Sequence, residues 1–161
     1  MFKVGFGQDS HRFSEDKKRK LILGGVEFEN CCGLKGNSDA DVIIHAICNA
    51  LEQSIGGKSF SVYADLMYRE RGTIDSVEYL KVAVNHIQER GYFINNLGIT
   101  VEAKQPMILP MENDIKNRLA PILNIKSADI GINATSGEEM TSFGKGEGIQ
   151  VFAIVSLIKN S

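Results

Sequence analysis

The sequence lacks the features of several large classes of protein. Its 161 residues include three cysteines, and two of them, Cys31 and Cys32, are adjacent. An odd set of this kind does not form a disulfide framework, which indicates a reducing compartment. No segment approaches the ~20 apolar residues that a membrane span needs, and charged side chains near the N-terminus exclude a signal peptide. We therefore expect a cytoplasmic protein without a membrane partner.

The chain also has little net charge. Its formal charge is −2 at pH 7, which gives no general attraction to nucleic acid. The 43% hydrophobic and 24% charged content is typical of a soluble globular protein. The length is large enough for a real core and predicts a single domain over residues 1–161.

Hydrophobic spacing alternates between the periods of strands and helices. An apolar segment around Gly24 and Gly25 predicts a strand with a bulge or tight bend, and Ser38 is the expected cap of the first helix. The predicted strands cover 2–7, 21–28, 97–103, 130–134 and 149–158, and the predicted helices cover 38–55, 59–71, 75–90 and 115–123. This order predicts an α/β (α+β) single-domain sandwich, with one mixed β-sheet and helices packed on one face.

The opening strand runs directly into Asp9 and His11. Residues two apart in an extended segment point to the same side, so these side chains project together from the strand end. A carboxylate and an imidazole form half of a divalent-metal site. His45, in the first helix, is the candidate third ligand, and an open fourth position is typical of catalytic zinc. The alternative is that His45 is an ordinary core or surface histidine with a satisfied hydrogen bond.

Two further segments could bind a ligand. One segment follows a strand and consists of Thr135, Ser136, Gly137 and Glu138. Its hydroxyls and backbone N–H groups suit phosphate, and its acidic side chain suits Mg²⁺. The alternative is a common Gly-rich turn. The segment 103–110 carries two prolines and could present backbone groups to a base, or it could be a plain connection between elements.

With these segments identified, the chain resembles the 2-C-methyl-D-erythritol 2,4-cyclodiphosphate synthase family over essentially its whole length. No single motif is decisive, but five occur in the right order at compatible spacings. They are Gly5–His11, Ser38–His45, Pro106–Pro110, Ala134–Glu138 and Gly144–Ile149.

The resemblance implies a homotrimeric phosphorus–oxygen lyase of non-mevalonate isoprenoid biosynthesis. Its substrate would be 4-diphosphocytidyl-2-C-methyl-D-erythritol 2-phosphate, which cyclises and releases CMP. Zn²⁺ would bind Asp9, His11 and His45, and Mg²⁺ or Mn²⁺ would bind near Glu138. The resemblance assigns catalysis to Asn37 and Ser136. It assigns substrate binding to Asp9, His11, Asn37, Ser38, Asp65, Ala103, Lys104, Gln105, Pro106, Met107, Ile108, Leu109, Thr135, Ser136, Gly137, Glu138 and Lys145.

The chain departs from the family pattern at several positions. Asn37 stands where the family usually has a histidine. An amide can donate a hydrogen bond to phosphate, but it carries no charge and no proton to exchange. No acidic residue occurs over 53–64, where the family contacts ribose and erythritol. Met107 and Lys145 replace the usual lysine and arginine. Two alternatives therefore stay open: a trimeric protein that binds isoprenoid diphosphates with weak or no turnover, and a broader zinc-dependent phosphoesterase.

Overall fold

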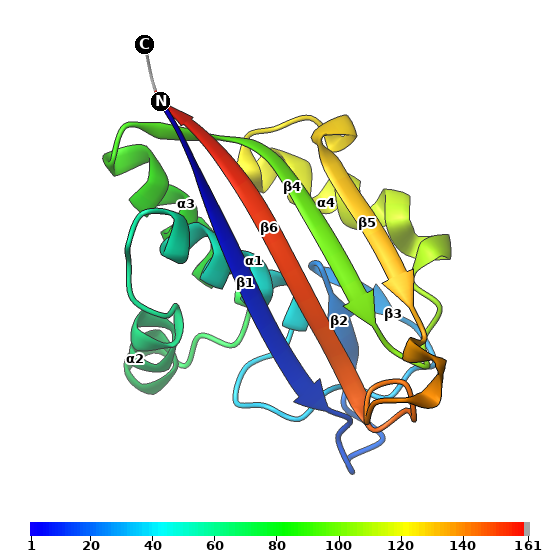
Figure 1. Ribbon diagram of the computed structural model, residues 1–161. Helices are drawn as coiled ribbons and strands as arrows, with labels where there is room; N and C mark the ends of the chain where they lie inside the picture. The colour runs from blue at the N-terminus through cyan, green and yellow to red at the C-terminus, as the bar shows by residue number, and fades with distance from the viewer. Residues whose placement is uncertain (160–161) are drawn as a thin grey trace.

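The computed structural model of the protein describes residues 1–159. Within this range lie a four-stranded sheet, a two-stranded hairpin and four α-helices (Figure 1). None of these helices is both long enough and apolar enough to cross a membrane. The elements are β1 (Phe2–Arg12), β2 (Leu21–Leu23), β3 (Val26–Phe28), α1 (Val42–Ser54), α2 (Ser61–Arg71), α3 (Ser76–Glu89), β4 (Tyr92–Glu102), η1 (Leu109–Met111), α4 (Glu112–Leu123), η2 (Ser127–Asp129), β5 (Ile130–Thr135), η3 (Gly137–Glu139) and β6 (Gly148–Lys159).

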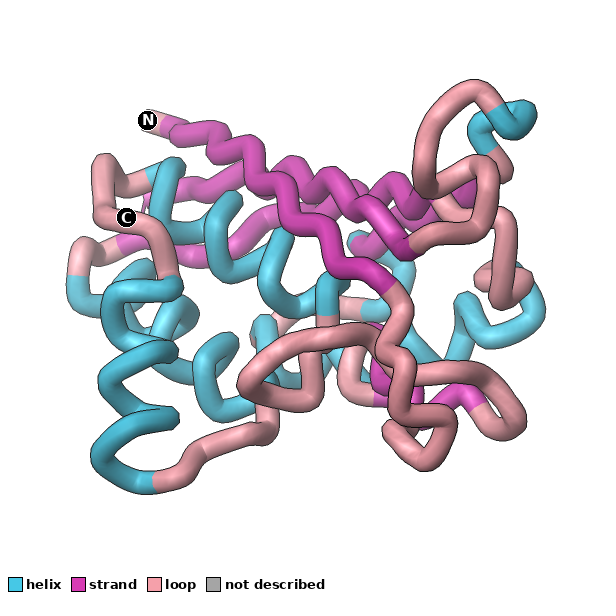
Figure 2. The backbone as a smooth tube through the Cα atoms, turned by 90° about the horizontal axis from the view of Figure 1, so that it is seen from below, coloured by secondary structure: helices cyan, strands magenta, loops and turns pink. Residues whose placement is uncertain are grey.

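The main sheet is mixed and has the order β1-β6-β4-β5. Strand β6 is antiparallel to both of its neighbours, whereas β4 and β5 are parallel. Strands β1, β4 and β5 therefore run in one direction and end at the same edge, as their arrowheads show in Figure 1. The α-helices all lie on one side of this sheet (Figure 2). The predicted fold class, including the mixed sheet and the position of the helices, is confirmed.

The predicted strands have different limits in the structure, most clearly at β1, at the hairpin and at β4, which begins at Tyr92 rather than at residue 97. Strand β1 does not end at Gly7, because it pairs with β6 along its whole length, from Phe2 with Ile158 to Arg12 with Gly148. Asp9 and His11 therefore lie within the strand rather than beyond its end. The segment 21–28 is not one bent strand but the hairpin β2–β3, in which Gly24 and Gly25 form the turn with φ of 62° and 73°.

Helix α1 begins later than predicted. Ser38 does not cap it, because Ala40 has a φ of 56° and redirects the chain before the helix starts. The cap is Asp41, whose carboxylate accepts the N–H of Ile44 at 3.0 Å. The same buried carboxylate accepts the N–H groups of Gly24 and Gly25 at 2.8 and 2.6 Å. Asp41 therefore ties the start of α1 to the β2–β3 turn.

Helix α1 packs against β1 at unusually short range. A Cβ atom on Gly5 would lie 1.9 Å from the carbonyl oxygen of Ala50, and one on Gly7 would lie 2.1 Å from that of Ala46. Any side chain at these two positions would push the helix away from the sheet. The glycines thus bring His45, next to Ala46, toward the strand that carries Asp9.

The other face of the sheet carries an apolar patch near the start of β1, which is open in the single chain. Even-numbered residues of β1 point toward it, and Phe6 stacks on Phe152 with ring centroids 5.8 Å apart. Strand β6 lies between β1 and β4, in keeping with its apolar residues on both faces. Contiguous exposed apolar surface of this kind marks an interaction site. Its large exposed residues are Phe2, Val4, Phe6, Phe93, Ile154 and Ile158.

Candidate metal centre and active site

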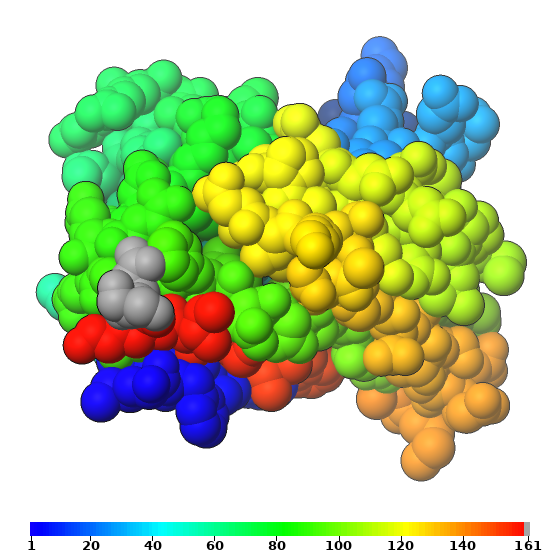
Figure 3. All heavy atoms as spheres, turned by 90° about the horizontal axis from the view of Figure 1, so that it is seen from above, coloured from blue at the N-terminus to red at the C-terminus, as the bar shows by residue number. Residues whose placement is uncertain are grey.

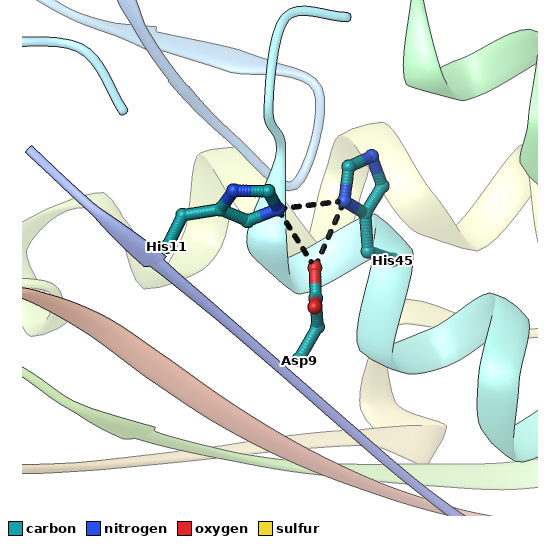
Figure 4. A group of neighbouring side chains, drawn as sticks. All are labelled: Asp9, His11 and His45. Atoms are coloured by element: carbon teal, nitrogen blue, oxygen red, sulfur yellow. Dashed lines mark hydrogen bonds and ion pairs between the residues drawn. The ribbon is translucent and has the colours of Figure 1, made fainter. Parts of the chain in front are cut away.

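Asp9, His11 and His45 meet at the junction of β1 and α1 (Figure 4). Asp9 and His11 are two residues apart on the strand and face the helix, and His45 comes from the first turn of α1. Oδ2 of Asp9 lies 3.0 Å from Nε2 of His11 and 2.9 Å from Nδ1 of His45. The two ring nitrogens are 3.3 Å apart. Two donor atoms from one strand and a third from a helix more distant in the sequence thus converge on one point.

This donor set fits a zinc ion. Tetrahedral zinc with bonds of about 2.0–2.1 Å holds its ligand atoms about 3.3 Å apart. The three observed separations, 2.9, 3.0 and 3.3 Å, differ from that value by at most a few tenths of an ångström. Two imidazoles and one carboxylate, with a fourth position left for solvent or substrate, form the ligand set of a catalytic rather than a structural site. The predicted Asp9, His11 and His45 site is therefore present as a candidate metal centre.

Each imidazole is held through its other nitrogen. Nδ1 of His11 lies 2.7 Å from the carbonyl oxygen of Lys35, which can only accept, so this nitrogen carries a proton. Nε2, which faces Asp9, is then the nitrogen that would bind a cation in place of a proton. On His45 the outer nitrogen is Nε2, which lies 2.9 Å from Oγ of Ser76. Sequence reasoning missed this contact, because Ser76 reads only as part of a helix start.

The charges within the triad stabilise one another. Burial by itself raises the pKa of Asp9, but hydrogen bonds from His11 and His45, with the charge of these rings, outweigh it and lower the pKa to about 2. Burial lowers the pKa of His11, but the hydrogen bond and the charge of Asp9 together raise it by more, so the pKa of His11 lies above its ordinary value. The carboxylate is therefore ionised at neutral pH and attracts positive charge, whether protons or a metal ion.

A cavity of about 460 Å³ opens beside the triad. Besides Asp9 and His11, its wall includes three further residues that the family resemblance assigns to substrate binding, namely Asn37, Ser38 and Asp65. Phe60 and Tyr79 form its apolar side, and the ring of Phe60 lies 4.8 Å from that of His45. These two aromatic residues were not singled out from the sequence, because their spacing is that of ordinary core positions. The volume is in the range of small-molecule sites.

The remaining candidate residues form a second group at the same edge of the sheet. Strands β4 and β5 pair in parallel up to Glu102 and Thr135, so the segments that follow them start side by side. The N–H of Ala103 donates to the carbonyl oxygen of Thr135 at 3.0 Å. In Figure 3 the segment between β5 and β6 stands out from one corner of the molecule. The group comprises residues 103–109, 135–138 and Lys145.

Within this group the side chains have distinct environments. Ile108 is buried, so only its backbone can face a ligand, whereas Met107 is 77% exposed. Lys104 pairs with Glu139, with 2.7 Å between Nζ and Oε1. The peptide between Gln105 and Pro106 is cis.

The Thr135–Glu138 turn is built from hydroxyl and backbone contacts. Oγ1 of Thr135 accepts the N–H of Gly137 at 3.1 Å, and Oγ of Ser136 accepts that of Glu138 at 3.4 Å. Each hydroxyl keeps its own proton for an external acceptor. Glu138 has a φ of 50°, a left-handed conformation that costs about 1–3 kcal/mol and is concentrated at functional sites.

The two groups are separate within one chain. Strand β1 carries the triad and β5 carries the Thr135 turn, with β6 and β4 between them. Three strand spacings of ~4.8 Å put β1 and β5 about 14 Å apart. Among the described residues, Glu138 does not belong to the Asp9, His11 and His45 cluster.

The chain is similar to proteins of known sequence and structure. A sequence model of the YgbB family matches residues 2–158. A curated relative from Chlamydia trachomatis serovar A, named 2-C-methyl-D-erythritol 2,4-cyclodiphosphate synthase, is 41% identical over 160 residues, which cover 99% of this chain and 89% of the relative. The structure of IspF from Plasmodium falciparum in complex with CDP superposes with a TM-score of 0.85 at 27% identity, covering 99% of this chain and 97% of that one. The bifunctional IspDF from Campylobacter jejuni gives a TM-score of 0.89 at 30% identity, covering 99% of this chain and 42% of that one.

Proposed function

The chain belongs to the YgbB family, and we propose that it acts as a 2-C-methyl-D-erythritol 2,4-cyclodiphosphate synthase, as its curated relatives are named. In this reaction an oxygen of the 2-phosphate forms a bond to the β-phosphorus of 4-diphosphocytidyl-2-C-methyl-D-erythritol 2-phosphate. The bond from the β-phosphorus to the bridging oxygen breaks, and CMP leaves as a cyclic diphosphate forms. The enzyme would thus be a phosphorus–oxygen lyase.

The observation that carries this proposal is the convergence of three donor atoms beside a cavity lined by Asn37 and Ser38. Phosphoryl transfer needs the reacting groups in line and their charge neutralised, with little covalent help from the protein. Zinc on Asp9, His11 and His45 would supply positive charge and a coordination position for a phosphate oxygen. The amide of Asn37 would donate a hydrogen bond to phosphate from the cavity wall.

The Thr135 turn would serve the other phosphate. The hydroxyl protons of Thr135 and Ser136 would be donated to oxygens that gain charge in the transition state. Glu138 offers one carboxylate, which suits Mg²⁺ or Mn²⁺ because such ions take their other ligands from phosphates and water. The backbone of residues 103–109 would recognise cytosine, and Lys145 would add positive charge nearby.

A homotrimer would bring these groups together. The triad and the Thr135 turn are separated by two strands in one chain, so a neighbouring subunit could supply the cytidine pocket to the triad. The apolar outer sheet face, with Phe6 and Ile154 each about half exposed, supports self-association. Three free cysteines support a reducing compartment such as the cytoplasm.

The test is product formation followed by ³¹P NMR. The purified protein with zinc and Mg²⁺ should convert the diphosphocytidyl substrate into CMP and the cyclic diphosphate in equal amounts. His11→Ala and His45→Ala should abolish both products. His86→Gln is the matched control, because His86 pairs with Glu52 at 2.7 Å outside the site. Release of inorganic phosphate instead of the cyclic product would indicate the phosphoesterase alternative.

One observation favours a second candidate function, the trimeric isoprenoid-diphosphate-binding protein. Arg12 and Glu147 form an exposed ion pair of 3.1 Å at the end of the apolar face. A trimer would enclose an apolar channel, which suits an isoprenoid chain, and the Arg12 guanidinium at its end would have to leave Glu147 to pair with the diphosphate. Zinc-independent binding of such a ligand without CMP release from the substrate would support this function over catalysis.

A further inference from the structure

A chain of hydrogen bonds leads from His45 away from the candidate metal position. Nε2 of His45 lies 2.9 Å from Oγ of Ser76, and this hydroxyl in turn contacts Oδ1 of Asp39. Ser76 is fully buried at the first position of α3. Neither Ser76 nor Asp39 lines the cavity beside the triad.

Asp39 is held firmly in place. It accepts the backbone N–H of Ser76 through Oδ2 at 3.0 Å and that of Asp41 through Oδ1 at 3.1 Å. Its own N–H donates to the carbonyl oxygen of Ile74 at 2.8 Å. The carboxylate therefore has a fixed position between the start of α1 and the start of α3.

The direction of this chain follows from the chemistry of its members. An ionised carboxylate only accepts hydrogen bonds, so the single hydroxyl proton of Ser76 is donated to Asp39. The lone pairs of Oγ can then only accept from His45, which requires a proton on Nε2. Nδ1 is left with a free lone pair that points at the candidate metal position.

Asp9 opposes this arrangement in the absence of a metal ion. Its Oδ2 lies 2.9 Å from Nδ1 of His45, so it favours a proton on that nitrogen, which would block metal binding there. The Asp39–Ser76 chain favours the other tautomer. The side chain of His45 is 6% exposed, so water cannot replace Ser76 without a change in packing.

We infer that Asp39 and Ser76 are positioning residues that hold His45 in the Nε2–H tautomer, with Nδ1 ready to bind zinc. His11 is held in the opposite tautomer by the carbonyl oxygen of Lys35. The inference rests on the proposed metal site. Ser76 of α3 and Asp39 before α1 would thus decide which nitrogen of His45 binds zinc.

Two substitutions test the inference by different routes. Ser76→Ala removes the acceptor for Nε2–H and keeps the backbone contact with Asp39. Asp39→Asn is nearly isosteric, but its amide can donate to Ser76, which reverses the chain and favours a proton on Nδ1. Ser54→Ala is the matched control, because Ser54 is also a buried helix serine, and its hydroxyl donates only to the carbonyl oxygen of Leu51 at 2.6 Å.

The first readout is zinc affinity, measured by competition with a chromophoric chelator at constant pH. Loss of an outer hydrogen-bond partner typically costs about 10–100-fold in metal affinity. We expect a loss in this range for Ser76→Ala and Asp39→Asn and a change within about 2-fold for Ser54→Ala, as befits a position without contact to the ligands. Urea unfolding of the metal-free proteins separates this effect from loss of stability.

The second readout is the imidazole N–H of His45 in zinc-loaded protein with ¹⁵N-labelled histidine. The wild type and Ser54→Ala should show a slowly exchanging Nε2–H signal, which Ser76→Ala should lose. Unchanged affinity and an unchanged signal in Ser76→Ala and Asp39→Asn would overturn the inference while leaving the metal site intact. A wild-type protein that binds no zinc would overturn both the inference and the proposed metal site.

Discussion

Substitution of Gly7 by alanine tests the link between the fold and the metal site. A Cβ atom at this position would lie 2.1 Å from the carbonyl oxygen of Ala46 and 2.4 Å from the backbone nitrogen of Ala50. Non-bonded heavy atoms prefer about 3.5–4.0 Å, so α1 must move by on the order of 1 Å. His45 moves with it, away from Asp9 on β1.

The expected cost follows from the nature of the clash. Overpacking a core typically costs about 1–3 kcal/mol, and the upper end applies here because the opposing atoms are backbone rather than a flexible side chain. A loss of about 3 kcal/mol lowers the Tm of a domain of this size by about 10 °C. A shift of His45 by an ångström also separates the donor atoms, so zinc affinity should fall at least about 10-fold.

The assay compares Gly7→Ala with Gly131→Ala by thermal unfolding and by zinc competition. Gly131 is also a strand glycine, but a Cβ atom there would meet no heavy atom within 4 Å. We expect Gly131→Ala to keep both the Tm and the zinc affinity of the wild type. If the two variants behave alike, the close packing of α1 on β1 does not position the site and the reasoning is wrong.

Three further predictions address the cap, the outer face and the core. Burial raises the pKa of Asp41 to about 6, so its contribution to stability is present below its ordinary pKa of 3.8 and is lost as the pH rises through 6. Between pH 4.5 and 7.5, the free energy of unfolding of the wild type should therefore fall by about 2 kcal/mol more than that of Asp41→Asn. Urea unfolding in the presence of a chelator measures this difference, and parallel pH profiles would contradict it. If the proposed trimer forms through the open sheet face, Ile154→Lys should reduce it to monomers in sedimentation velocity, whereas Val62→Lys, at a similarly exposed position on α2, should not. Ile47→Ala, fully buried in α1, should cost about 2–5 kcal/mol, and Ile74→Ala, 57% exposed, should stay within about 0.5 kcal/mol.

The sequence predicted those parts of the site that depend on local spacing. Asp9 and His11 face one side because side chains alternate along a strand, and His45 was identifiable as a third candidate ligand in a helix. The fold class followed from the order of periodic segments. The apolar residues on both faces of β6 fit its place in the middle of the sheet.

Contacts between distant backbone segments could not be predicted in this way. Ser76 and Asp39 are polar residues at element ends, and nothing in their spacing indicates that they meet each other and His45. Asp41 caps α1 because the chain turns at Ala40, which has a φ of 56°. The sequence around Ser38 does not indicate this turn. The full length of β1 depends on its pairing with β6, which is nearly the whole chain away in sequence.

The central claim is that the Asp9, His11 and His45 centre makes the protein a metal-dependent cyclodiphosphate synthase. The most direct test is CMP release from the diphosphocytidyl substrate by protein stripped with a chelator and then titrated with zinc, with Mg²⁺ held constant. The stripped protein should release no CMP and should recover fully at one zinc per chain, whereas His45→Ala should not recover. CMP release that is unaffected by stripping, or absent at every zinc concentration, would contradict it.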